Sequence, residues 1–189
     1  MHACRRRIRT MTAHAHHKKP TGLEIRQMVL DDLPAVYALG EKLFRAGDAP
    51  NLYRTWTDYV LVDSFSADRD FCLVAELEGE VIGFVLGYTY TKRRNSWTYG
   101  YLEWMGVAQE WNSHGVGRAL VDSLTRLFRE EGVRMMIVDT EAENHRAIDM
   151  FQKLGFNHPV EHVYMTRVLK PSPAAKAPKT NLPNEGVNE

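Results

Sequence analysis

The sequence predicts a mixed α/β domain in which a central, mostly antiparallel sheet is flanked by helices. Two observations carry this prediction. Short apolar runs typical of strands alternate along the chain with amphipathic segments of helical period. In addition, the runs at residues 71–77 and 81–90 flank a Glu-Gly-Glu turn at residues 78–80, which indicates a β-hairpin. Residues 99–107 follow as a third antiparallel strand.

The N-terminal part is expected to form one strand and two helices. Residues 23–28 make the strand, and Asp31 or Asp32 then caps a helix, because a short polar side chain can accept hydrogen bonds from the unpaired N–H groups of the first turn. That helix is expected to end near residue 45, where an Ala-Gly-Asp-Ala-Pro-Asn segment interrupts the chain. A second helix is predicted over residues 52–63.

The C-terminal part is expected to alternate helix and strand. Residues 115–131 place apolar side chains at a spacing of about 3.6 residues, which predicts a helix with one face in the core. A buried strand is predicted at residues 135–140, a helix at 144–154 and a last strand at 163–169.

The two ends of the chain differ in composition from this central part. Residues 1–21 are basic, rich in histidine and without periodicity, and residues 170–189 are rich in Pro, Ala and Lys. Both are interpreted as disordered tails around a domain at residues 22–169. The N-terminal histidines are assigned to the tail and not to a metal site, so no metal is expected.

Composition argues against several classes of protein. The 24 basic and 24 acidic residues balance, which gives no general electrostatic case for a nucleic-acid or membrane partner. Two cysteines make no disulfide framework. No apolar run approaches the roughly 20 residues that span a bilayer, and the basic start lacks the apolar stretch of a secretory signal. A cytoplasmic location is therefore expected.

The segment from Tyr99 to Leu120 predicts an anion site. An apolar strand leads into a polar loop, and Gly115-Val116-Gly117 then opens an amphipathic helix. The first N–H groups of a helix have no intrahelical partner and carry partial positive charge, and glycine leaves room for a phosphate to approach them. The glycines fit neither the GxxxxGK[ST] loop nor the dinucleotide fingerprint. A purely structural turn is the alternative.

Three ordered motifs resemble those of the GNAT family of N-acetyltransferases. The opening Leu-Glu-Ile-Arg segment at residues 23–26, followed by two aspartates at 31–32, resembles the family's first strand and helix. The VxxxxNxxGxG pattern at residues 107–117 resembles the family's acetyl-CoA motif, and Asn144-His145-Arg146-Ala147 with the FxxxGF segment at residues 151–156 resembles its downstream motif. The resemblance covers residues 23–169. Two positions depart from the pattern, because Asn112 replaces the usual Gln or Arg and Phe151 replaces the tyrosine that often serves as general acid.

The resemblance implies an acyl-CoA N-acyltransferase fold and a site for acetyl-CoA. The diphosphate would lie on the N-terminus of the glycine-opened helix, and the pantetheine would pair with the preceding strand where two strands splay apart. Asn144 would contact the cofactor, cap its own helix, or do both. For His114 and Arg118 the alternative is a solvated surface position. The expected cofactor-binding residues are Gly106, Val107, Ala108, Asn112, Ser113, His114, Gly115, Val116, Gly117, Arg118 and Asn144.

Glu103 is the candidate general base. A protonated amine is not a nucleophile, and an alkyl amine with a pKa near ~10.4 is almost wholly charged at neutral pH. Glu103 lies in an otherwise apolar run, and its Tyr-Leu-Glu context resembles the catalytic glutamate of polyamine-type family members. The alternative is a solvated strand carboxylate. Since Phe151 cannot donate a proton, Tyr164 or a water is the candidate acid.

Aromatic residues of the first two helices are a candidate acceptor wall. Phe44, Tyr53, Trp56 and Tyr59 lie where the resemblance places the acceptor, although core packing explains the same residue types. The basic Lys-Arg-Arg segment at residues 92–94 is interpreted as a polar turn and not as a nucleic-acid site.

The sequence therefore predicts an acetyl-CoA-dependent N-acetyltransferase that transfers acetyl directly to a primary amine in a ternary complex. The acceptor is a protein N-terminus, a lysine or a small amine, and a homodimer is an open question. A catalytically silent CoA-binding regulatory module is the alternative function.

Overall fold

The structure of this chain is a computed structural model that describes residues 20–44, 55–91, 97–161 and 163. The chain divides into two units, residues 1–159 and residues 160–189. All helices and strands described below belong to the first unit. In the second, residues 160, 161 and 163 are described, and they form neither helix nor strand. Most of both predicted tails, the predicted strand at 163–169 beyond its first residue, and Tyr164 lie outside the described residues.

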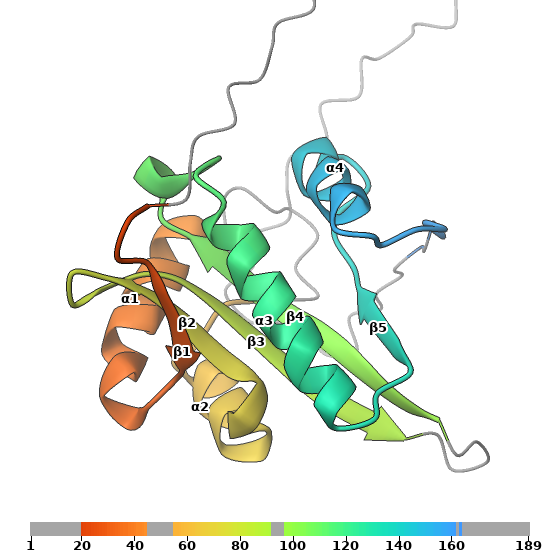
Figure 1. The fold of residues 1–189 in the computed structure, drawn as a ribbon, viewed down its shortest axis with the longest axis horizontal. Helices are drawn as coiled ribbons and strands as arrows, with labels where there is room; N and C mark the ends of the chain where they lie inside the picture. The colour runs from red at the N-terminus through yellow and green to blue at the C-terminus, as the bar shows by residue number, and fades with distance from the viewer. Residues whose placement is uncertain (1–19, 45–54, 92–96, 162, 164–189) are drawn as a thin grey trace, which may run out of the picture. The chain divides into compact units, whose positions relative to one another are not determined.

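The described part of the first unit is a five-stranded sheet with helices on both faces, which confirms the predicted fold class (Figure 1). The strands are β1 (Glu24–Gln27), β2 (Cys72–Leu77), β3 (Glu80–Thr91), β4 (Thr98–Val107) and β5 (Met135–Val138). The α-helices are α1 (Leu33–Leu43), α2 (Asp58–Ala67), α3 (Val116–Glu130) and α4 (His145–Lys153). Three short 3-10 helices are η1 (Leu30–Asp32), η2 (Arg69–Phe71) and η3 (Gln109–Trp111).

The sheet follows the order β1-β2-β3-β4-β5. The first four strands pair antiparallel, and β5 pairs with β4 in parallel. The predicted hairpin is confirmed, because β2 and β3 pair directly across Glu78 and Gly79, both of which have positive φ angles. Glycine adopts such angles without a steric penalty, so Gly79 suits this turn.

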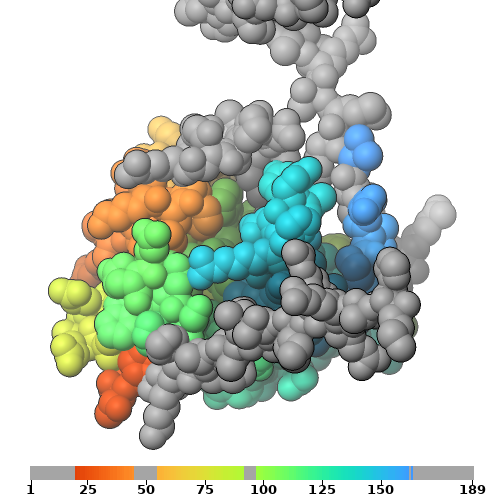
Figure 2. Space-filling view, turned by 90° about the horizontal axis from the view of Figure 1, so that it is seen from above, coloured from red at the N-terminus to blue at the C-terminus, as the bar shows by residue number. Residues whose placement is uncertain are grey.

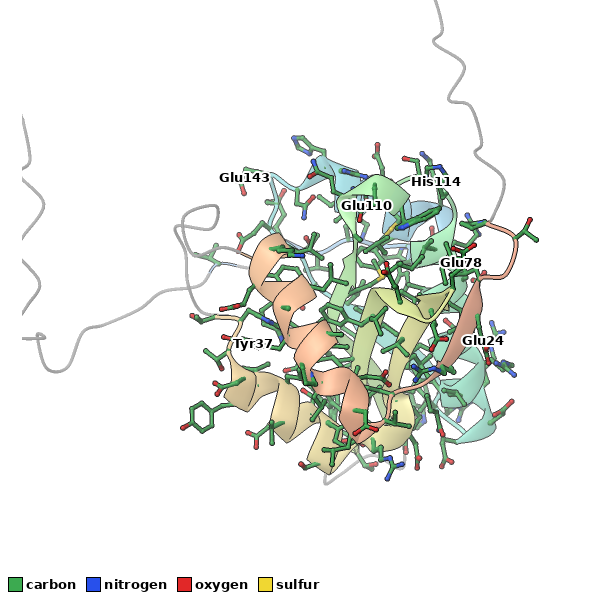
Figure 3. The ribbon with its side chains drawn as sticks, turned by 90° about the vertical axis from the view of Figure 1, so that its left-hand side faces the viewer. Glu24, Tyr37, Glu78, Glu110, His114 and Glu143 are labelled. Atoms are coloured by element: carbon green, nitrogen blue, oxygen red, sulfur yellow. The ribbon has the colours of Figure 1, made fainter. Side chains whose placement is uncertain are left out.

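Two hydrophobic clusters fill the two sides of the sheet. Helix α3 covers one face, and α1 with α2 covers the other (Figures 1 and 3). The cluster under α3 includes Leu73, Ala75, Val85, Leu102, Leu120, Leu124, Phe128 and Phe151. The cluster under α1 and α2 includes Met28, Val36, Trp56, Leu61, Cys72, Val74, Phe84 and Leu86. Burial of each large apolar side chain contributes about 1.5–3 kcal/mol.

Three predicted elements differ from the structure in their bounds. Helix α2 spans Asp58–Ala67 and not residues 52–63. It begins at Asp58 because the Thr57 side chain caps it by accepting a hydrogen bond of 3.3 Å from the Val60 N–H. Helix α1 ends at Leu43, two residues early. Strand β5 spans four residues, and its first, Met135, is 48% exposed. Because β5 is the last strand in the sheet order, fewer neighbouring elements cover it.

A partly buried ion network joins β1 to β2 and to the start of α1. The Arg26 guanidinium lies 2.7 Å from an Asp32 carboxylate oxygen and 2.7 Å from a Glu76 carboxylate oxygen on β2. The hydrogen bond from Arg26 holds the pKa of Asp32 below its usual value. The Asp32 side chain thus accepts hydrogen bonds from Arg26 and, at 2.8 Å, from the Val29 N–H. It makes no capping bond to α1, contrary to the prediction.

Among the described residues, no helix is both long and apolar enough to span a bilayer.

Candidate active site

A bulge in β4 determines where Glu103 points. Leu86 of β3 pairs with Trp104, and the next residue, Gly87, pairs with Leu102, so Glu103 is an extra residue without a partner on β3. An extra residue interrupts the alternation of side chains between the two faces. Leu102 packs under α3, whereas Trp104 packs under α1 and α2. The bulge places Glu103 on the same face as Trp104, where the Ser64 hydroxyl of α2 donates to its carboxylate at 3.1 Å.

Strands β4 and β5 cease to pair beside this bulge. Their parallel pairing ends at Leu102 and Val138, whereas β4 continues to Val107. The Ala108 N–H donates to the Ile82 carbonyl at 2.8 Å, so the peptide groups of Ala108 point toward β3. Because N–H and C=O directions alternate along a strand, those of Val107 point away from β3. Beyond Leu102, this edge of β4 has no strand partner among the described residues.

The backbone directions bear on two predicted cofactor contacts, Gly106 of β4 and Ala108 directly after it. The backbone of Gly106 faces β3, like that of Ala108, whose carbonyl also accepts from the Trp111 N–H at 2.9 Å. Sequence reasoning missed Met105, which lies two residues before Val107 and presents its peptide groups to the same unpaired edge. The period of two along a strand would have identified it.

The absent Cβ of Gly106 has a structural reason. A Cβ built there would lie 2.6 Å from Leu43 Cδ1 of α1 and 2.9 Å from Phe84 Cε1 in the core. The lack of a Cβ at Gly106 therefore allows α1 to pack closely against the sheet, whether or not its backbone also contacts the cofactor.

Replacement of Gly106 by alanine should destabilise the fold. The added methyl must displace Leu43 and the buried Phe84 ring, and overpacking of this kind costs about 1–3 kcal/mol. Denaturant unfolding measures the change. Gly117→Ala is the matched control, since a Cβ at Gly117 meets its neighbours at ordinary contact distances of 3.6–3.8 Å. Equal stability of the two variants would contradict this account of Gly106.

The N-terminus of α3 lies beside the unpaired edge of β4. A Cβ at Gly117 would lie 3.7 Å from Val107 Cγ2, 3.8 Å from Met105 Cε and 3.6 Å from Met150 Sδ of α4. Gly115 precedes the helix with φ 81°, a left-handed conformation that suits glycine. The first helical bond runs from the Ala119 N–H to the Gly115 carbonyl at 3.0 Å.

The first N–H groups of α3 are those of Val116, Gly117 and Arg118. They precede the first intrahelical donor, and no side chain caps this helix among the described residues. The first turn carries no acidic residue. The helix N-terminus thus presents partial positive charge next to β4, which is an arrangement that favours an anion.

The predicted loop residues gather at one end of the sheet. Figure 3 labels Glu110, His114 and Glu143 at this end, with Glu143 on the opposite side from His114. Figure 2 looks onto this end, with the green segment of residues 108–115 beside the cyan segment that leads into α4. His114 packs its ring edge-on to Trp111, and its Nδ1 lies 2.9 Å from the Asn112 carbonyl. Arg118 donates to the Lys153 carbonyl of α4 at 3.3 Å.

Asn144, directly before α4, and Phe151, within α4, both have structural roles. The Asn144 side chain caps α4 by accepting from the Ala147 N–H at 3.2 Å, and its amide donates to Thr140 Oγ1 at 3.1 Å. Phe151 is buried under α3 and packs edge-on to Phe156. Ser113 adopts φ 68° in the loop before α3. Within the described ranges, no group of three or more side chains could hold a metal ion.

Two of the four aromatic residues considered for an acceptor wall pack in the core, as the alternative interpretation expected. Trp56 is only 7% exposed, contacts Phe44 and Trp104, and donates from its indole to the Tyr37 carbonyl at 3.1 Å, so Phe44 and Trp56 belong to the core. Tyr59 is 80% exposed on α2, and Tyr53 lies outside the described residues.

Four tyrosines instead line the face that carries Glu103. Tyr88 of β3 stacks on Tyr101 of β4 with ring centroids 5.2 Å apart. Tyr90 stacks on Tyr99 at 5.3 Å, and the Tyr101 hydroxyl donates to the Asp139 carboxylate after β5. Gly100, between Tyr99 and Tyr101, and Gly87, directly before Tyr88, face Phe128 of α3, so the tyrosines lie on the opposite side. Two Tyr-x-Tyr patterns in successive predicted strands were the available signal.

Two solved structures illustrate the fold that this chain shares. The aminoglycoside N-acetyltransferase AAC(6')-Iy in complex with a bisubstrate analogue matches with a TM-score of 0.63 and 22% identity, over 77% of this chain and 98% of that chain. Ard1 from Thermoplasma volcanium matches with a TM-score of 0.62 and 22% identity, over 74% of this chain and 86% of that one. At these identities the likeness concerns the fold.

The sequence comparisons agree with this class. An acetyltransferase of Pectobacterium atrosepticum is 29% identical over 136 residues, which are 71% of this chain and 87% of that protein. The model of the Acetyltransferase (GNAT) family matches residues 33–156, well over half of the chain. The chain belongs to the GNAT acetyltransferase family and is an N-acetyltransferase.

Proposed function

We propose that this chain transfers acetyl from acetyl-CoA directly to a primary amine, with Glu103 as the general base. The observation that carries the proposal is the bulge that turns Glu103 toward α2 at the residue where β4 and β5 cease to pair. A carrier lying along the unpaired edge of β4 would bring its thioester next to this carboxylate, while the acceptor approaches from the face of the tyrosines.

The proposed carrier site combines two sets of backbone donors. The N–H groups of residues 116–118 would bind the diphosphate, with the loop residues from Asn112 to Gly115 around it. The peptide groups of Met105 and Val107 would pair with the pantetheine. An N–H from the same edge would bind the developing oxyanion, an interaction worth about 3 kcal/mol in comparable sites.

The proposed reaction needs no covalent enzyme intermediate. The amine nitrogen attacks the thioester carbon, Glu103 takes an amine proton, and the C–S bond breaks to release the CoA thiolate, which is a fair leaving group. Cys72 is an unsuitable nucleophile, because burial, together with the charges of Asp68 and Glu103, raises the pKa of its thiol to about 12. Phe151 is buried and has no proton to donate, so the proton for the thiolate comes from Tyr164 or water.

The acceptor is proposed to be a primary amine of a protein N-terminus, a lysine or a small molecule. AAC(6')-Iy is an aminoglycoside acetyltransferase, and the NatC complex, a further structure with this fold, was solved with a Gag peptide and CoA. Both kinds of amine therefore belong in the assay. A cytoplasmic location and a homodimer remain predictions.

Loss of the Tyr88 ring should weaken the acceptor site and spare the carrier site. Tyr88→Ala removes the partner on which Tyr101 stacks, and an aromatic face holds an ammonium or apolar amine by about 0.5–2 kcal/mol. We expect KM for the amine to rise about 3- to 30-fold, with an unchanged KM for acetyl-CoA. Tyr59→Ala, at an exposed tyrosine of α2, is the control. A change confined to the KM of acetyl-CoA would contradict the assignment.

The silent CoA-binding module remains a second candidate function. Two observations favour it: Asn112 departs from the family pattern, and Phe151 is a core residue without an acidic proton. Such a module would bind acetyl-CoA and never consume it.

The deciding experiment is calorimetry with acetyl-CoA, followed in the same sample by thiol release against pooled small amines, N-terminal peptides and lysine peptides. Binding with turnover supports the proposed enzyme, and the active pool identifies the acceptor class. Binding without turnover against every pool favours the silent module. No binding would refute the carrier site.

A further inference from the structure

We propose that Ser64 of α2 is a positioning residue for Glu103, and that its hydroxyl accommodates both the ionised and the protonated carboxyl group. The inference rests on the proposed role of Glu103 as general base. It concerns a different question, namely how the carboxylate keeps its place while its charge changes.

The geometry gives the Ser64 hydroxyl two acceptors. Its Oγ lies 3.1 Å from Glu103 Oε2 and 3.0 Å from the Val60 carbonyl one helical turn earlier. A serine hydroxyl has one proton to donate and lone pairs with which to accept. It can therefore donate to one of these groups at a time, and the charge on Glu103 decides which one.

The Ser64 hydroxyl has a hydrogen-bonding role in both protonation states of Glu103. When Glu103 is ionised, the hydroxyl donates to the carboxylate, since a bond to a charged acceptor is the stronger one. When Glu103 has taken the amine proton and carries it on the oxygen that faces Ser64, its carboxylic O–H donates to Ser64 Oγ, and the hydroxyl turns to the Val60 carbonyl. The bond between Ser64 and this carboxyl oxygen is kept in either state, so the transfer avoids the cost of losing it in a half-buried site.

The backbone of Ser64 is anchored independently of Glu103. Its carbonyl accepts from the Asp68 N–H at 3.1 Å, and the Cys72 thiol of β2 lies 3.6 Å from the same carbonyl. Leu61, one turn earlier on α2, is buried in the core. These contacts hold the last turns of α2 against the sheet, so the hydroxyl is presented to Glu103 from a fixed position.

Several titratable groups surround Glu103 among the described residues. The charge of Glu103 acts on the Cys72 thiol of β2, and so does the charge of Asp68, which directly follows α2. On its own strand Tyr101 shares its face and holds Asp139, and Tyr88 lies beside Tyr101 on β3. Ser64 itself does not titrate in this range, and it donates a hydrogen bond to the carboxylate from α2.

The test compares pH profiles of kcat/KM for Ser64→Ala, Ser64→Thr, Ser66→Ala and Glu103→Gln. Removal of a donor to the ionised carboxylate favours its protonated form, so the acidic limb of Ser64→Ala should move up by about one pH unit. Activity below that limb should fall about tenfold, with an unchanged KM for acetyl-CoA. Ser64→Thr keeps a hydroxyl and should restore the profile. Ser66→Ala, at an exposed serine of α2, should match the native protein.

A second readout does not depend on turnover. Carbon-detected NMR titration of the glutamate carboxyl groups should show the Glu103 signal, assigned by its loss in Glu103→Gln, titrating at higher pH in Ser64→Ala than in the native protein. An unmoved signal together with an unmoved acidic limb would overturn the role of Ser64. If the native protein turns over no amine, or if Glu103→Gln retains the native profile, the proposed function fails instead.

Discussion

Replacement of Glu103 by glutamine is expected to lower turnover by about 10²–10⁴-fold while leaving the affinity for acetyl-CoA nearly unchanged. Glutamine has the shape of glutamate and can still bond to Ser64, so the packing under α2 is preserved. What it lacks is a basic lone pair of sufficient strength to take a proton from the amine. The loss should be largest at low pH, where most of the amine is protonated and the uncatalysed supply of free amine is smallest.

The measurement is kcat as a function of pH, with calorimetry of acetyl-CoA on the same preparations. Glu24→Gln is the matched control, because Glu24 is an exposed strand glutamate on β1, at the other edge of the described sheet. Rates that remain at the native level across the pH range would refute the assignment of Glu103 as the base. A loss of acetyl-CoA affinity equal to the loss of rate would assign Glu103 to carrier binding instead.

The second large effect is expected for Gly117→Glu, which should abolish acetyl-CoA binding without unfolding the protein. A carboxylate in the first turn of α3 interacts favourably with the helix dipole, so helix stability should be maintained or increased. The same charge repels a diphosphate bound to the N–H groups of that turn. Unit charges 4 Å apart near a protein surface repel by about 4 kcal/mol, which corresponds to roughly 10³-fold in the dissociation constant.

Gly117→Ala separates charge from bulk in this experiment. A methyl group at this position lies no closer than 3.6 Å to its neighbours, so the alanine variant should fold normally. It should lose much less affinity for acetyl-CoA than the glutamate variant. Native affinity in Gly117→Glu, with a melting temperature at or above the native one, would show that the N-terminus of α3 does not bind the diphosphate.

Much of the fold followed from local patterns in the sequence. The period of the apolar residues identified α3, and the Glu-Gly-Glu turn identified the β2–β3 hairpin, because both depend on the conformational preferences of neighbouring residues. The start of α2 was wrong for a local reason as well. Thr57 followed by Asp58 is a capping signal, and the prediction placed the start of the helix before this signal.

The site was only partly accessible from the sequence. Glu103 was identified from a carboxylate in an apolar run, and the loop before α3 from its glycines. The four tyrosines proposed to line the acceptor site were not predicted, whereas Phe44 and Trp56, which were considered for it, lie in the core. Aromatic residues look alike in sequence whether they pack inside or line a surface, and the difference depends on which elements cover them.

The sequence by itself determined the order of the elements, the glycine-opened helix and the candidate base, since each depends on residues close together in the chain. Only the tertiary structure decided the direction of Glu103, the unpaired edge at Met105 and Val107, and the contact between Ser64 and Glu103. These depend on a one-residue shift between β3 and β4 and on pairing with β5, which joins residues more than thirty positions apart. A shift of one residue exchanges the two faces of a strand, and no local preference specifies it.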